Sequence, residues 1–168
     1  MAFVHTTLGW QPKAGGVLKA VGAGGRYGAL AVRFSNALNP ERDLQLEFFT
    51  EHSDFAGTDN GRVPTMFSHG LAIGEQPIFK RFADAVFGDA ELTRLDNGIF
   101  GTIRLDPANS MESALADLIE QGALRFSSGS TAQFVRRGTD GQILRWPIVE
   151  LSVTPTPAEW RLPKIRRL

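Results

Sequence analysis

The sequence has no cysteine among its 168 residues. Without thiols the protein cannot form a disulfide, use a cysteine nucleophile or bind zinc through thiolates, and this composition fits a reducing compartment. An excess charge of one sign is also missing, because 18 Lys and Arg residues balance 18 Asp and Glu residues. No field of the whole molecule therefore attracts nucleic acid or an anionic membrane, and we expect neither as a partner.

Long apolar runs are missing as well. No run approaches the roughly 20 apolar residues that a membrane-spanning helix needs. Residues 1–6 lack the charged-then-apolar order of a secretory signal. We therefore expect a protein of the cytoplasm in which it is made. With 42% hydrophobic residues, the chain is long enough for one domain with its own core.

Several familiar site motifs are incomplete. The glycine-rich stretch 15–25 has Tyr27 where a dinucleotide-binding pattern needs its last glycine, and no phosphate-loop lysine follows, which favours a flexible loop. Around Ser127, Arg125 replaces the first glycine of a Gly-x-Ser-x-Gly elbow, which argues against an α/β-hydrolase. The three histidines lack zinc-site spacing: His5, His52 and His69. We expect neither a metal nor a cofactor.

Strand signals dominate the rest of the chain. A helix is predicted over 110–121, because Asn109 and Glu112 have capping-box spacing and Gly122 can end it. A weaker helix is predicted over 76–87. Alternating or continuous apolar residues predict strands over 27–34, 43–49, 91–95, 99–105, 123–127, 131–136 and 142–153, the last interrupted at Pro147.

Turn residues join these strands closely. Asp96-Asn97-Gly98 predicts a tight hairpin, and Thr139-Asp140-Gly141 predicts a second turn. Strands joined by short turns leave little room for parallel crossover helices. The fold class is therefore predicted as mainly β, a single-domain and mainly antiparallel sheet or barrel with one or two helices.

Three separated residues together have the chemistry of acyl transfer to a serine: His69, Ser127 and Glu150. Strand alternation puts Ser127 and Arg125 on one face, so that the Ser127 hydroxyl can border a solvent-accessible groove. Alternation also turns Glu150 to the same side as Ser152. The alternative is that Ser127 lies in a polar turn and that His69 and Glu150 are solvated.

Four segments, in this order, resemble the successive signatures of tailed-phage prohead maturation proteases. They are 42–50 with 53–55, 68–70, 122–130 and 146–158. The family is similar in fold to the herpesvirus assemblins, in which a β-barrel is wrapped by helices. The resemblance thus implies an assemblin-type barrel, with 1–26 as a flexible N-terminal segment, 27–161 as the protease domain and 162–168 as a basic tail. We expect that tail to be a solvated end, with a docking tag or a self-cleavage remnant as alternatives.

The resemblance implies a serine endopeptidase inside the immature phage capsid, in the bacterial cytoplasm. Its partners would be scaffold or capsid-protein propeptides, which it cleaves along with itself, and a homo-oligomer remains open because assemblins pair. The family's histidine, serine and acid fall on His69, Ser127 and Glu150. His69 would take the Ser127 proton and Glu150 would orient the imidazole. Two alternatives are an inactive protease-like head protein that binds scaffold and a small esterase.

Overall fold

The computed structural model describes residues 4–5, 24–71, 73–75 and 77–168. Within them, an eight-stranded sheet has the order β1-β6-β9-β3-β4-β5-β2-β10, and two short strands pair separately as β7-β8. The strands are β1 (Val4–His5), β2 (Gly25–Arg33), β3 (Arg62–Phe67), β4 (Val86–Leu95), β5 (Gly98–Leu105), β6 (Arg125–Thr131), β7 (Arg136–Arg137), β8 (Ile143–Arg145), β9 (Glu150–Thr154) and β10 (Arg166–Arg167).

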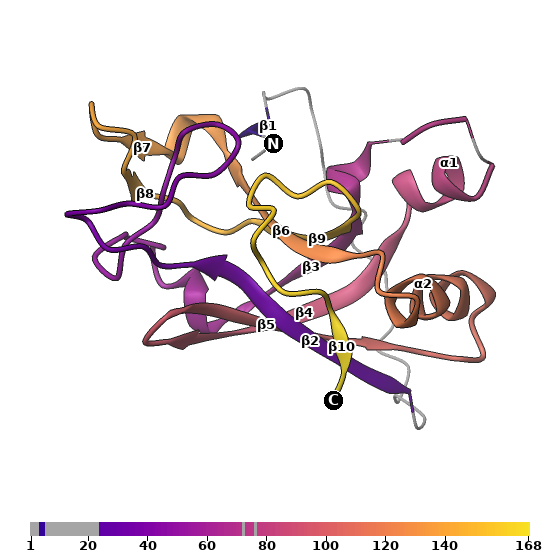
Figure 1. Cartoon of the computed structure of the whole chain (residues 1–168). Helices are drawn as coiled ribbons and strands as arrows, with labels where there is room; N and C mark the ends of the chain where they lie inside the picture. The colour runs from indigo at the N-terminus through magenta and orange to yellow at the C-terminus, as the bar shows by residue number, and fades with distance from the viewer. Residues whose placement is uncertain (1–3, 6–23, 72, 76) are drawn as a thin grey trace.

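The described helices are α1 (Pro77–Ala83) and α2 (Ser110–Glu120), with single 3₁₀ turns η1 (Thr58–Asn60), η2 (Ser68–Gly70) and η3 (Ala132–Phe134). The large sheet curls into a half-barrel, which brings β2 near β6 (Figure 1). This confirms the prediction of a mainly β fold with two helices. No helix in the described ranges is long and apolar enough to cross a membrane.

The sheet is mainly antiparallel, as predicted, but it also contains two parallel pairs. β3 runs parallel to β9, and β1 runs parallel to β6. The parallel pair β3 and β9 is possible because the connection between them is long and contains the β4–β5 hairpin and α2. Short turns elsewhere in the chain therefore do not determine how these two strands pair.

The strongest local predictions are confirmed. β4 and β5 form a hairpin in which Leu95 pairs with Gly98. A Cβ atom at Gly98 would lie 2.0 Å from the Val32 carbonyl oxygen, so only glycine fits beside β2. The side chain of Asn109 caps α2 by accepting the Met111 and Glu112 N–H groups.

Two predicted strands are absent from their places. Residues 43–47 form a turn, because the Asp43 carboxylate accepts the N–H groups of Gln45 and Glu47 and Leu46 adopts a φ of 63°. Phe48 and Phe49 form only isolated β-bridges, to Gln142 and Phe34. Residues 131–136 contain η3. The neighbouring strand β9 begins only at Glu150, opposite Gly129, so it offers residues 131–136 no hydrogen-bonding partner. The weaker helix predicted over 76–87 is shorter, and β4 already begins at Val86.

Both ends of the chain differ from the predicted domain limits. Val4–His5 and Gly25–Arg26 belong to strands, while residues 1–3 and 6–23 of the predicted flexible segment lie outside the described residues. Residues 162–168 are not a solvated tail. Leu162 and Ile165 are buried, and β10 pairs with β2. The basic side chains of this segment, Lys164, Arg166 and Arg167, are exposed, and the burial of Leu162 and Ile165 holds the segment on the sheet.

The C-terminal segment also joins the two sides of the curled sheet. The Ile165 N–H donates to the Leu124 carbonyl just before β6, and the Leu168 N–H donates to the Arg26 carbonyl on β2. Inside the curl lies the core, whose largest fully buried side chains are Trp146, Phe55, Phe67, Phe82, Phe126, Ile99, Ile103, Leu105, Leu115, Ile119, Leu124 and Ile143.

Candidate active site

The structure brings the three predicted site residues together in one hydrogen-bonded line. Nε2 of His69 lies 3.1 Å from Oγ of Ser127, and Nδ1 of His69 lies 2.5 Å from Oε1 of Glu150. The three residues come from β6, η2 and β9, and 58 and 81 residues of sequence separate His69 from its two partners. Their contacts therefore depend on the pairing of the strands.

The register of β6 against β9 places two of the three side chains. Ser127 lies opposite Ser152, and Gly129 lies opposite Glu150. Side chains two residues apart on a strand share a face, so these four residues lie on the same side of the sheet. The prediction that Glu150 and Ser152 share a side is confirmed, because the Ser152 hydroxyl donates to Oε2 of Glu150 at 2.7 Å.

His69 is placed by the turn that follows β3. Ser68, His69 and Gly70 have φ values of 46°, 60° and 70°, so three successive residues are left-handed. This conformation costs a residue with a side chain about 1–3 kcal/mol and persists only where the surroundings hold it. It turns the chain sharply at the end of β3, beside the parallel strand β9.

Side chains of β9 hold this turn. The Ser152 hydroxyl accepts the His69 N–H at 2.7 Å, and the Thr154 and Ser68 hydroxyls are 2.9 Å apart. Together with Glu150, these residues are spaced two apart on β9 and share a face. Each of the three therefore binds the Ser68–His69 segment or the imidazole.

The hydrogen bonds also determine which imidazole nitrogen carries the proton. A carboxylate has no proton to donate, so Nδ1 of His69 donates to Glu150, and Nε2 is left to accept the Ser127 hydroxyl proton. The side chains of His69 and Glu150 are each only 3% exposed. Water therefore screens this charge-assisted contact little.

Gly129 makes room for the carboxylate. A Cβ atom at this position would lie 1.8 Å from Oε1 of Glu150, 2.7 Å from its Cδ and 3.0 Å from its Cγ. No side chain fits there while Glu150 contacts His69. Gly129 is thus required by the space that Glu150 occupies.

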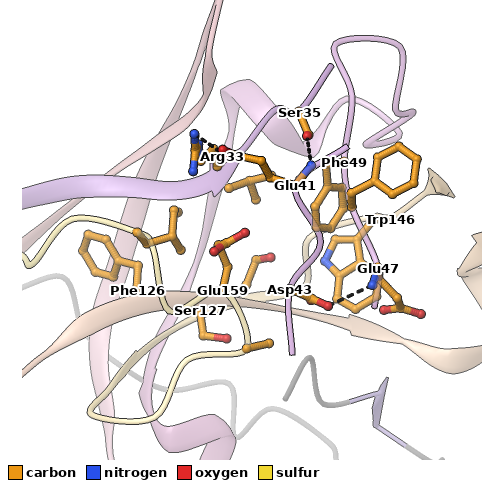
Figure 2. Close-up of a pocket in the computed structure, with 16 residues that line it drawn as sticks. Arg33, Ser35, Glu41, Asp43, Glu47, Phe49, Phe126, Ser127, Trp146 and Glu159 are labelled. Carbon is orange, nitrogen blue, oxygen red and sulfur yellow. Dashed lines mark hydrogen bonds and ion pairs between the residues drawn. The ribbon is translucent and has the colours of Figure 1, made fainter. Parts of the chain in front are cut away.

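A pocket borders Ser127 on the side of β2 and the C-terminal segment (Figure 2). Three of its four acidic side chains have basic partners: Glu41 pairs with Arg33 at 2.5 Å, Glu159 pairs with Arg161 at 2.5 Å, and Glu47 pairs with Arg137. The fourth, Asp43, accepts main-chain N–H groups. The hydrogen bond to Glu159 raises the pKa of Arg161. The pocket is lined by Ala31, Val32, Arg33, Ser35, Glu41, Asp43, Glu47, Phe48, Phe49, Phe126, Ser127, Ser128, Trp146, Ala158, Glu159 and Leu162.

Some neighbours of Ser127 differ from expectation. The polar turn considered for 127–130 is absent, because these residues lie within β6. Ser127 borders the pocket as predicted, but only 5% of its surface is exposed. Arg125, which strand alternation placed on the same face as Ser127, donates through Nε to the Leu162 carbonyl and so holds the C-terminal segment.

Sequence reasoning placed Ser152 beside Glu150 but missed its role in the site, and it missed Gly129 and Thr154 altogether. Ser152 and Thr154 could have been found from their spacing, because they follow Glu150 at intervals of two residues on a strand and therefore share its face. Both side chains can form hydrogen bonds. Gly129 carried no comparable signal, because its role depends on the register between β6 and β9.

Comparison of the chain with models of protein families, with curated proteins and with solved structures found no match. Among the residues that the structure describes, no group of three or more His, Asp or Glu side chains gathers as a metal site. The chemistry of the site therefore has to be inferred from its own geometry.

Proposed function

We propose that the chain is a serine endopeptidase of the prohead protease type, with an assemblin-like barrel as its scaffold. The single observation that carries this proposal is the continuous line from the Ser127 hydroxyl through the His69 imidazole to the Glu150 carboxylate. The curled β-rich sheet and the four ordered sequence segments support it.

In the proposed mechanism, the Ser127 oxygen attacks a peptide carbonyl carbon while Nε2 of His69 takes the hydroxyl proton. The resulting imidazolium is stabilised by Glu150, which accepts a hydrogen bond from Nδ1–H throughout and remains ionised, while the Nδ1 proton stays on the ring. Nε2 then gives its proton to the leaving amine as the C–N bond breaks, which leaves an acyl group on Ser127. Water repeats the sequence and releases the acid product.

Between Leu124 and Ser130, the described residues pair no strand with the edge of β6 that faces away from β9, and this edge offers a place for an extended substrate. Peptide groups along a strand point alternately to its two edges. The Gly129 carbonyl points to β9, because it accepts the Val149 N–H. The peptide groups of Ser128 and Phe126 therefore point to the other edge. On that edge Leu124 already accepts from Ile165 of the C-terminal segment. A substrate strand that adds between this segment and β1 would run beside Ser127.

The proposed substrates are scaffold or capsid-protein propeptides, and the chain itself, inside an immature capsid in a bacterial host. A second candidate, a protease-like head protein that binds scaffold without cleaving it, is favoured by one observation. Ser127 and His69 are only 5% and 4% exposed, so a polypeptide reaches them only if the pocket opens.

The test is co-expression with the cognate scaffold or capsid protein. We expect that partner to be shortened by the wild type and left intact by Ser127→Ala. The matched control is Ser130→Ala, which removes another buried hydroxyl of β6 that donates to the Pro147 carbonyl rather than to His69. We expect it to cleave like the wild type. A fluorophosphonate should label the wild type at Ser127.

Each alternative gives a different result. Cleavage by Ser127→Ala, or a label on Ser128 or Ser130, would remove Ser127 as the nucleophile. A folded wild type that neither cleaves nor is labelled would leave the scaffold-binding head protein. Turnover of soluble esters without any cleavage of the head proteins would indicate the small esterase.

A further inference from the structure

Ser152 takes no proton in the proposed mechanism, yet it forms hydrogen bonds to both His69 and Glu150. We propose that Ser152 is a positioning residue that holds the imidazole of His69 against Ser127 by fixing the main chain of His69 and the side chain of Glu150 at the same time. This inference rests on the proposed function and adds a fourth residue to its site.

Both hydrogen-bonding roles of the Ser152 hydroxyl are used. Its oxygen accepts the His69 N–H at 2.7 Å, and its proton goes to Oε2 of Glu150 at 2.7 Å. The residue is 0% exposed. Since a buried N–H or carboxylate oxygen without a partner is costly, this one hydroxyl stabilises both groups.

The two bonds close a ring of contacts. Glu150 reaches His69 directly through Oε1 and Nδ1, and it reaches the His69 backbone through Oε2 and Ser152. A single contact would let the imidazole pivot about the carboxylate. A second contact, to the main chain of the same histidine, fixes the distance and the angle together.

The second contact, from Ser152 to the His69 main chain, matters because the turn at His69 is strained. Its left-handed φ of 60° is strained, so the turn tends to relax toward ordinary dihedrals unless it is held. A relaxed turn would move the imidazole relative to β6 and Ser127. A displacement of about 1 Å at a reacting group can lower a rate by about 100-fold.

The test measures the reaction of Ser152→Ala with a fluorophosphonate. We expect a fall of about 10- to 100-fold in the maximal inactivation rate with an unchanged inhibition constant, because the position of His69 changes and the binding surface does not. Proton NMR supplies a reading that needs no reaction. The low-field resonance of the Nδ1 proton should move upfield or broaden.

Ser130→Ala is the matched control, since Ser130 is equally buried and the substitution also removes a hydroxyl that forms a hydrogen bond, one bond where Ser152→Ala removes two. It should keep the wild-type reactivity and resonance. If Ser152→Ala does not fold, the pair Ser152→Thr and Ser152→Val compares a retained with a removed hydroxyl at similar volume. Only the threonine variant should then react at close to the wild-type rate.

The possible failures are distinguishable. A wild type that does not react refutes the proposed function, while the shift of the Nδ1 resonance in Ser152→Ala still tests the positioning role. A reactive wild type whose Ser152→Ala variant reacts equally well and keeps its resonance overturns the role of Ser152. So does a threonine variant that is no better than the valine variant.

Discussion

The substitution Gly129→Ala tests the site through the space that Glu150 needs. The new Cβ atom would lie 1.8 Å from Oε1 of Glu150, whereas real Cβ contacts essentially never fall below 3.0 Å. The neighbouring atoms Cδ and Cγ lie at 2.7 and 3.0 Å, so rotating the carboxylate alone does not relieve the overlap. The carboxylate has to move by more than 1 Å, and its 2.5 Å contact with His69 breaks.

Two magnitudes follow from this movement. Hydrogen bonds to charged groups contribute about 1.5–3 kcal/mol, and a buried group left without its partner adds to that loss. We therefore expect the melting temperature to fall by several degrees. The rate of reaction with a fluorophosphonate should fall by about 100-fold or more, because the imidazole loses the group that orients it.

Gly28→Ala is the matched control. Its Cβ atom would also be crowded, at 2.8 Å from a Phe100 ring atom and 2.9 Å from a methyl of Leu168, but it meets neither His69 nor Glu150. We expect it to lose stability and to keep its rate. A Gly129→Ala protein that reacts like the wild type would show that the Glu150 contact does not matter to the chemistry. Equal rate losses in both variants would attribute the effect to general destabilisation.

Three further measurements test the rest of the fold. Burial, and then the hydrogen bond to Glu120, raise the pKa of Tyr27, the one tyrosine of the chain, so its phenolate absorbance should appear above the usual pH of about 10. The unfolded phenol ionises first, so stability should fall as pH rises through that range, and Tyr27→Phe should remove this slope in chemical denaturation. Asn109→Ala should cost about 1 kcal/mol in the same assay, and an unchanged midpoint would refute the cap. Ile165→Ala should cost about 2–5 kcal/mol because the side chain is buried, whereas Leu168→Ala, 61% exposed, should cost much less; equal effects would contradict the C-terminal packing.

Local patterns were enough to predict the elements whose own residues fix them. The hairpin at Asp96–Asn97 and the helix after Asn109 depend on turn and cap chemistry within a few residues. The turn at 43–47 shows the limit of such patterns. The alternation of polar and apolar residues predicted a strand there. The Asp43 carboxylate instead accepts two nearby N–H groups and stabilises a turn, and the pattern of apolar residues does not reveal such bonds.

The candidate site was predicted only as a set of residue types. Ser127, His69 and Glu150 were named from their chemistry and their order, and alternation along β9 correctly paired Glu150 with Ser152. The distances could not be predicted, because they depend on the parallel pairing of β3 with β9 and on the antiparallel register of β6. Both pairings join segments far apart in the chain.

The turn that presents His69 explains why the sequence alone could not place it. Positive φ is uncommon for any residue other than glycine, and although histidine adopts it more often than serine, only Gly70 clearly marks the turn as left-handed. What holds the strained residues lies on another strand, in the hydroxyls of Ser152 and Thr154. The same strand carries Glu150, so one register of β9 both fixes the turn and orients its imidazole. A shift of that register by one residue would reverse the face of all three side chains and remove every one of these contacts at once.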